Sequence, residues 1–197
     1  MPATIELFYD FRSPYSYLAF TQLVRIDAEL ILRPMSLLSV MEKVGNVPTT
    51  LTCKAKGDYA RVDLGRWAHR YGVALNPSDM RANDGDACSR AVLGAASTDE
   101  AIAVTLALYR ALWSKAVTLG DSAAVVKTLK DAGVDTATIA TRIDGAEIVD
   151  KLATNTEEAA QRGVFGSPTM FVGDAMFFGN DRLDFVAQEL ARQDQAA

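Results

Sequence analysis

Strand-like patterns at both ends of the chain constrain its fold more than any other feature of the sequence. At the first end, residues 4–9 are rich in β-branched and aromatic side chains, and residues 30–35 form a second run of this kind. Between them, Ser13 and Pro14 predict the start of a helix, because Ser is a good N-cap and Pro suits the first helical position. A helix that reaches about residue 29 is long enough to connect two parallel strands. This end therefore predicts a β-α-β unit.

The other end of the chain predicts an antiparallel pair of strands followed by a helix. Residues 168–172 and 175–178 are apolar runs that flank Gly173 and Asp174, a dipeptide typical of a tight hairpin turn. Residues 182–191 then follow the periodicity of an amphipathic helix. Because a pair of strands is only marginally stable alone in water, we expect the strands from both ends to share one sheet.

The middle of the chain has a helical character. Residues 36–57 contain several helix-breaking residues and predict a loop or a broken helix, whereas residues 58–71 predict a helix that Gly72 ends. Nearly all of residues 84–160 follow a helical pattern. These patterns predict an α/β protein with a large all-helical insertion. The expected parts are a discontinuous α/β domain, residues 1–36 and 146–197, and the helical insertion, residues 37–145.

The composition excludes several classes of function. The 197 residues include 20 Lys and Arg against 25 Asp and Glu, so the net charge is −5 and we expect no nucleic-acid partner. The single histidine, His69, and the two cysteines, Cys53 and Cys88, are too few and too scattered for a His- and Cys-rich zinc site. The cysteines also form no Cys-x-x-Cys redox pair. We therefore expect neither a bound metal nor disulfide chemistry.

The sequence also predicts where the protein works. Its longest run without a formal charge, residues 13–24, has 12 residues, whereas a membrane-spanning helix needs about 20. The first residues show neither the basic nor the apolar region of a secretory signal. We therefore expect a cytoplasmic protein with no membrane contact.

Five sequence motifs occur along the chain in the order found in a known family. They are FYDFRSPYSYLA at residues 8–19, GNVP at 45–48, DYARVDL with RWA at 58–68, VFGSPTMFVG at 164–173 and FGNDRL at 178–183. With the order of elements, they make the chain resemble the 2-hydroxychromene-2-carboxylate isomerases, a group similar to kappa-class glutathione transferases within the thioredoxin-fold disulfide oxidoreductases. A redox member would carry Cys-Pro-x-Cys where this chain has Ser13-Pro14-Tyr15-Ser16. Without those two sulfurs, dithiol exchange at this place is not possible.

The resemblance implies a thioredoxin-like fold, glutathione as cofactor, a small aromatic carboxylate as substrate and a homodimer. The implied reaction converts 2-hydroxychromene-2-carboxylate to trans-o-hydroxybenzylidenepyruvate in bacterial breakdown of naphthalene-type aromatics, with the glutathione thiolate as covalent catalyst. Two alternatives stay open. One is a kappa-like transferase that consumes glutathione on electrophiles, and the other is a non-catalytic thioredoxin-like module that binds glutathione or a peptide edge.

Ser13 is the expected catalytic residue. An ordinary thiol has a pKa of about 8.5, and the free N–H groups and dipole of a helix N-terminus lower it by favouring the anion. The hydroxyl of Ser13 lies at such a terminus and can donate a hydrogen bond to the sulfur. From Ser13 and Pro14 alone a plain N-cap is the better interpretation, but the other motifs favour thiolate stabilisation.

Further glutathione contacts are implied by the resemblance. Pro168 matches the cis-proline of the family, which would present the backbone N–H and C=O of Ser167 to the cysteinyl part of glutathione. The alternative is an ordinary proline at the start of a strand. Asn180 and Asp181 would hold the γ-glutamyl carboxylate and ammonium at a helix N-terminus, or serve only as a cap. The remaining candidate contacts are Asn46, Pro14 and Tyr15.

The candidate substrate contacts are Lys54, Lys56, Phe11 and Met80. The two lysines lie in an otherwise uncharged segment, and a positive group is needed near two anionic ligands. The alternative is that both lysines are simply solvated. Phe11 could line an aromatic pocket, as could Trp67 and Phe165, although such residues more often lie in a core. Residue Asn46, likewise, has the alternative role of a turn asparagine.

Overall fold

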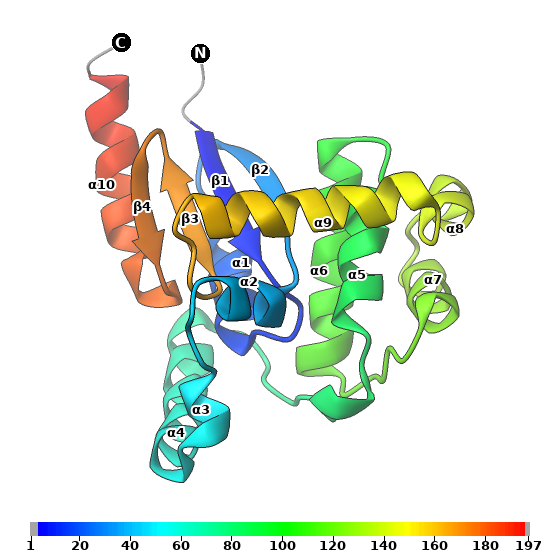
Figure 1. The fold of residues 1–197 in the computed structure, drawn as a ribbon, viewed down its shortest axis with the longest axis horizontal. Coiled ribbons are helices and arrows are strands. Elements are labelled where there is room, and N and C mark those ends of the chain that lie inside the picture. The colour runs from blue at the N-terminus through cyan, green and yellow to red at the C-terminus, as the bar shows by residue number, and fades with distance from the viewer. Residues whose placement is uncertain (1–3, 196–197) are drawn as a thin grey trace.

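The computed structural model describes residues 4–195 and contains a mixed four-stranded sheet (Figure 1). Its strands are β1 (Thr4–Tyr9), β2 (Glu29–Pro34), β3 (Thr169–Val172) and β4 (Ala175–Phe178), in the spatial order β2-β1-β3-β4. β1 pairs in parallel with β2, and β3 pairs antiparallel with both β1 and β4. The prediction that strands from the two ends share one sheet is confirmed.

Helices make up most of the remaining described chain. They are α1 (Pro14–Leu23), α2 (Leu37–Lys43), α3 (Thr49–Thr52), α4 (Lys54–Tyr71), α5 (Gly85–Leu93), α6 (Thr98–Ser114), α7 (Ser122–Asp131), α8 (Ala137–Arg142), α9 (Ala146–Gln161) and α10 (Leu183–Asp194), with the short 3-10 turns η1 (Met80–Ala82) and η2 (Asn180–Arg182). Among residues 4–195, no helix combines the length and the apolar character needed to cross a membrane.

Helix α1 is shorter than the sequence pattern predicts. It ends at Leu23 instead of near residue 29, and Val24 caps it with an N–H that bonds to carbonyls of the last turn. Arg25 and Ile26 then make tighter turn hydrogen bonds of 3.0 Å to Gln22 and Leu23. The chain must turn here because β2 begins at Glu29, in register with the first residue of β1. Tertiary pairing thus overrides the local helical pattern.

Helix α4 begins at Lys54, earlier than the predicted residue 58, and Gly72 ends it as predicted. Gly72 has a φ of 66°, a left-handed conformation that favours glycine at the C-terminus of a helix. The segment before α4 is a broken helix, as expected, and consists of α2 and α3. Together α3 and α4 project from the body of the molecule (Figure 1).

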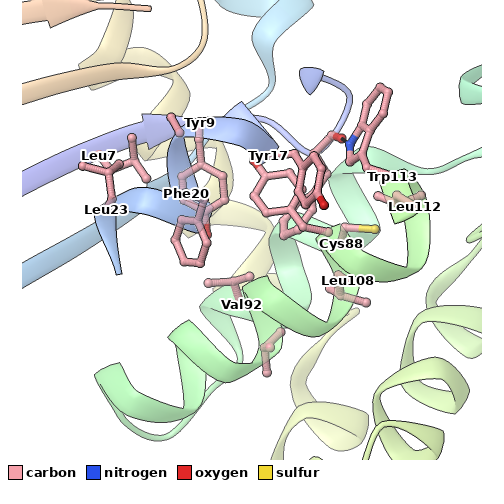
Figure 2. Packing of buried hydrophobic residues seen from close by; sticks show 14 of the residues in the cluster. Leu7, Tyr9, Tyr17, Phe20, Leu23, Cys88, Val92, Leu108, Leu112 and Trp113 are labelled. Carbon is pink, nitrogen blue, oxygen red and sulfur yellow. Dashed lines mark hydrogen bonds between the residues drawn. The ribbon is translucent and has the colours of Figure 1, made fainter. Parts of the chain in front are cut away.

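The main core joins one face of the sheet to α1 and the inserted helices, and a smaller buried cluster around Phe8 and Phe171 covers the other face. Tyr109 of α6 lies in the centre of the main core, 1% exposed, with its ring within 6.0 Å of the rings of Tyr9 and Phe20. Figure 2 shows these side chains of β1 and α1 above α5 and α6, which contribute Val92 and Leu108. The division into residues 1–36 with 146–197 and residues 37–145 stays a prediction, and its outermost residues, 1–3 and 196–197, lie outside the described chain.

A charged cluster on the face of the sheet opposite α1 involves Glu6 of β1. Arg33 donates a hydrogen bond of 2.7 Å to Glu6, and Arg162 donates a second one. Burial alone would raise the pKa of Glu6, but the hydrogen bonds from Arg162 and Arg33 outweigh it and hold this pKa below its ordinary value. A carboxyl whose pKa is lowered by folding stabilises the protein above its unfolded pKa, and this contribution is lost as the pH falls through the folded pKa.

We therefore expect acid to destabilise the wild type more steeply than the Glu6→Gln variant, starting as the pH falls below about 4.5. Urea unfolding at a series of pH values from neutral to acidic measures this difference. Glu29→Gln is the matched control, because Glu29 is an exposed β2 residue and should leave the acid profile unchanged. Parallel profiles of the wild type and Glu6→Gln would contradict the expectation.

Candidate functional site

The site is built on the turn between β1 and α1. Ser13 has an extended backbone conformation, with φ −92° and ψ 112°, and its hydroxyl accepts a hydrogen bond of 3.2 Å from the N–H of Ser16. Ser13 is thus the N-cap of α1, with Pro14 at the first helical position as predicted. Asp10 stabilises the turn, because its backbone carbonyl accepts a hydrogen bond of 3.1 Å from the N–H of Ser13.

The loop before β3 packs directly against this helix terminus. The peptide bond between Ser167 and Pro168 is cis, as predicted. Ser13 donates its hydroxyl proton to the carbonyl of Ser167 over 2.9 Å, and the hydroxyls of Ser16 and Ser167 lie 2.5 Å apart. Asp10 also donates its N–H to the hydroxyl of Ser167 at 3.0 Å. Two predicted site residues that are far apart in sequence, Ser13 and Ser167, are therefore in direct contact.

A pocket of about 220 Å³ opens beside Ser167. It is lined by Tyr15, Asp63, Trp67, Ser167, Phe178, Gly179, Asn180 and Asp181. Four of the predicted glutathione contacts thus line one pocket, and one of these four, Ser167, accepts a hydrogen bond from Ser13. A larger hollow of about 790 Å³ lies between α2, α5 and α9, and none of the predicted site residues lines it. The smaller pocket is the candidate site because the predicted chemistry converges there.

The polar end of this pocket contains a buried hydrogen-bond donor with no partner. Asn180 is 3% exposed, and its side-chain Nδ2 makes no hydrogen bond. Its backbone carbonyl accepts the Tyr71 hydroxyl at 2.7 Å, which fixes η2 against α4. Gly179 before it has a φ of 103°, and a side chain here would collide with the carboxylate of Asp181. Buried donors are rarely left unpaired, so Nδ2 of Asn180 is the unusual polar atom at this end of the pocket.

Asp63 is a site residue that the sequence did not identify. Tyr15 donates its hydroxyl proton to Asp63 over 3.2 Å. Burial and the nearby Asp63 carboxylate raise the pKa of Tyr15, so its phenol stays protonated. The available signal was helical spacing, since Asp63, Trp67 and Tyr71 lie on one face of α4. The sequence alone does not show that this face of α4 packs toward the site.

Phe11 does not line the pocket, which corrects one substrate contact expected from the sequence. It is fully buried, with its ring centroid 4.7 Å from that of Tyr109, and its carbonyl accepts the Trp113 indole N–H at 3.0 Å. Met80 is also placed elsewhere, partly buried against the main core. Both side chains face the apolar interior because the inserted helices cover that side of the turn.

Lys54 and Lys56 are likewise not beside the pocket in this chain. Both lie in the first turn of α4, and Lys54 is 90% exposed and paired with Asp58 at 2.5 Å. At about 1.5 Å per residue, about 13 Å of helix separates Lys54 from Asp63. A positive group that does approach the pocket wall is Arg70, whose guanidinium lies 5.3 Å from the ring centroid of Trp67.

Asn46 binds the loop before β3 rather than facing the pocket. Its side-chain amide donates to the carbonyl of Phe165 at 2.7 Å, and its side-chain oxygen accepts the N–H of Val47 at 2.8 Å. The bond to Val47 is the turn role that was the alternative for Asn46, and the bond to Phe165 connects this turn to the cis-proline loop. Among residues 4–195, the structure contains no cluster of three or more His, Cys, Asp or Glu able to hold a metal ion.

Comparison with known proteins agrees with this geometry. A family model described as a DSBA-like thioredoxin domain matches residues 4–191. The chain belongs to the DSBA-like thioredoxin family. Over 196 residues it is 32% identical to a 2-hydroxychromene-2-carboxylate isomerase of Sphingobium xenophagum, with 96% of this chain and 99% of that protein covered. It is 28% identical over 210 residues to glutathione S-transferase kappa 1 of Rattus norvegicus, covering 98% and 92% of the two chains.

A solved structure of a 2-hydroxychromene-2-carboxylate isomerase superposes with a TM-score of 0.85 at 29% identity, covering 98% of this chain and 97% of the other. The predicted resemblance and the thioredoxin-like fold with a helical insertion are confirmed. In this DSBA-like protein, the first turn of α1 carries hydroxyls rather than thiols. Cys53 is exposed at the junction of α3 and α4, whereas Cys88 is buried in α5, where desolvation raises its pKa.

Proposed function

We propose that this protein is a glutathione-dependent isomerase that converts 2-hydroxychromene-2-carboxylate to trans-o-hydroxybenzylidenepyruvate in aromatic catabolism. The observation that supports this most is the contact between Ser13, the N-cap of α1, and Ser167 of the cis-proline loop, at the edge of a pocket with an unpaired buried donor. The proposal also draws on relatives of that name at 32% identity over nearly the whole chain.

The residues of the pocket fit glutathione. Its γ-glutamyl end carries a carboxylate and an ammonium group, which match the unpaired Nδ2 of Asn180 and the carboxylate of Asp181. Its peptide groups can pair with the backbone of Ser167, as an extended peptide pairs with a strand edge. Its sulfur would then lie at the N-terminus of α1, where Ser13 is the cap.

Bound glutathione would supply a thiolate nucleophile for reversible addition to a double bond of the substrate. The residues of this chain provide the environment for that anion. The free N–H groups of the first turn of α1 favour a negative charge. The hydroxyl of Ser13 can turn from the carbonyl of Ser167 toward the sulfur, while that carbonyl accepts a ligand N–H instead. Fixed donors at a developing anion are typically the largest catalytic contribution.

The aromatic product accumulates without net use of glutathione if this proposal is right. Incubation with the chromene carboxylate and a trace of glutathione, followed by absorbance, should give product in large molar excess over glutathione. An adduct formed in a one-to-one ratio with glutathione would instead favour a kappa-like transferase, a function that the 28% identical kappa relatives make a real alternative. Glutathione binding without either reaction would favour a non-catalytic module.

We also propose a cytoplasmic homodimer, by analogy with the family. Sedimentation equilibrium tests the assembly and should give twice the mass of the chain. A second chain is one way to bring further positive charge to the pocket, which Lys54 and Lys56 of the same chain do not supply. A monomer at concentrations where the enzyme is fully active would contradict the dimer.

A further inference from the structure

Two phenylalanines remain exposed at the edge of the candidate pocket. Phe165 is 38% exposed and Phe178 is 42% exposed, and their ring centroids lie 4.6 Å apart at an angle of 52°. Phe178 lines the pocket. By contrast, Phe8, Phe11 and Phe20 are fully buried. An exposed aromatic pair that borders a pocket is a surface suited to a ligand with apolar faces.

The backbone beside Ser167 is shaped to receive the Phe178 ring. Gly166 lies under this ring so closely that a Cβ at residue 166 would overlap it. The next residue, Ser167, accepts the hydroxyl proton of Ser13 through its carbonyl. Phe178 is also held from the other side, because the N–H of Gly179 bonds to the carbonyl of Pro168 at 3.0 Å. The ring therefore packs on Gly166, the residue next to Ser167, which contacts Ser13.

The size of the pocket favours an aromatic group on this surface. Pockets that enclose a drug-sized ligand usually measure about 300–1,000 Å³, and this one measures about 220 Å³. It cannot enclose both glutathione and a bicyclic ring. If its polar end, with Asn180 and Asp181, takes the γ-glutamyl group, the aromatic part of a second ligand must rest on the exposed rings at the edge.

We infer that Phe178, supported by Phe165, is the surface on which the aromatic ring of the substrate stacks, so that Phe178 determines specificity for aromatic carboxylates. This inference deepens the proposed function and depends on it for the identity of the substrate. A ring stacked on Phe178 would lie beside the cis-proline loop, in which Ser167 accepts the hydroxyl proton of Ser13. Aromatic pairs at such distances prefer offset or tilted geometries, as the Phe165 and Phe178 rings already adopt.

Phe178→Ala tests this directly. It should raise KM for 2-hydroxychromene-2-carboxylate by about tenfold, because the substrate loses one aromatic contact and the apolar surface buried in it. The affinity for glutathione, measured by calorimetry, should change by less than about threefold. Phe178→Leu keeps an apolar side chain against Gly166 and should show a smaller rise in KM. If Phe178→Ala does not fold, Phe178→Leu serves as the test variant.

Phe185→Ala is the matched control. Phe185 is an exposed phenylalanine of α10, 49% exposed and not part of the pocket wall, so its removal should change neither KM nor glutathione affinity. An unchanged KM in both Phe178 variants would overturn the inference. An equal weakening of glutathione binding would also overturn it, because Phe178 would then belong to the glutathione contact.

A binding measurement separates failure of this inference from failure of the proposed function. Chromone-2-carboxylate is an unreactive aromatic carboxylate of similar shape, and its affinity in the presence of glutathione can be measured without turnover. Binding that weakens about tenfold in Phe178→Ala supports the aromatic surface even if the wild type shows no isomerase activity. Equal affinities in the wild type and the variant would contradict it whether or not the enzyme turns over.

Discussion

Replacing Ser13 with alanine should lower kcat/KM for the isomerisation about 100- to 1,000-fold, the effect typical of removing one donor to a developing anion. The same change removes an N-cap, since the Ser13 hydroxyl accepts the N–H of Ser16, and also removes its hydrogen bond to Ser167. The free energy of unfolding should therefore fall by only about 0.5–2 kcal/mol. Steady-state kinetics and urea unfolding of the same preparation measure the two effects separately.

Ser97→Ala is the control for the cap. Ser97 caps α6 by accepting the N–H of Glu100 at 3.2 Å, far along the chain from the pocket, so its loss should cost similar stability and no activity. If Ser13→Ala keeps nearly full activity, the thiolate role is wrong and Ser13 is only a cap. If Ser97→Ala loses as much activity as Ser13→Ala, the loss reflects general destabilisation instead.

Removal of the Asp10 carboxylate should have the largest effect on stability. Asp10 is fully buried and accepts four hydrogen bonds of 2.7–3.2 Å from the backbone and guanidinium of Arg12, with a further one of 2.7 Å from the N–H of Leu37. In Asp10→Ala, the half-buried Arg12 keeps only Asp86 as an ionic partner. Breaking a buried ion pair by removing one partner typically costs about 3–5 kcal/mol. Urea unfolding at neutral pH should show a loss of this size.

Asp58→Ala is the matched control for a carboxylate that is not buried. Asp58 pairs with Lys54 and Arg61 on the exposed part of α4, and exposed pairs contribute about 0–1 kcal/mol. We expect the unfolding free energies of Asp58→Ala and the wild type to agree within this range. A cost for Asp10→Ala as small as that for Asp58→Ala would mean that the turn before Ser13 does not depend on its buried carboxylate.

The sequence predicted those parts of the site that depend on local chemistry. Ser13 and Pro14 predicted the start of a helix, and the motif around Pro168 predicted the cis peptide bond. The apolar runs at the two ends predicted the sheet because strand pairs cannot persist alone. Each of these features is set by a few neighbouring residues or by a simple requirement for burial.

The residues that were missed or misplaced depend on packing between distant elements. Phe11 lies inside the site motif, yet its side chain faces the interior because α6 brings Tyr109 and Trp113 against it. Asp63 faces Tyr15 only because α4 docks through Tyr71 to Asn180. The charge of Lys54 suggested a ligand contact, but its position depends on the direction in which α4 projects. None of these placements has a local signature.

The pKa of the thiol of glutathione bound to the wild-type protein tests the role of Ser13 and the α1 terminus most directly, and thiolate absorbance as a function of pH measures it. We expect a pKa clearly below the ordinary value of about 8.5, because the N-terminus of α1 and the hydroxyl of Ser13 favour the anion. In Ser13→Ala with glutathione bound, the pKa should lie between the wild-type and the ordinary values, since the helix terminus remains. A bound thiol in the wild type that titrates at its ordinary pKa would contradict thiolate stabilisation by Ser13 and the α1 terminus.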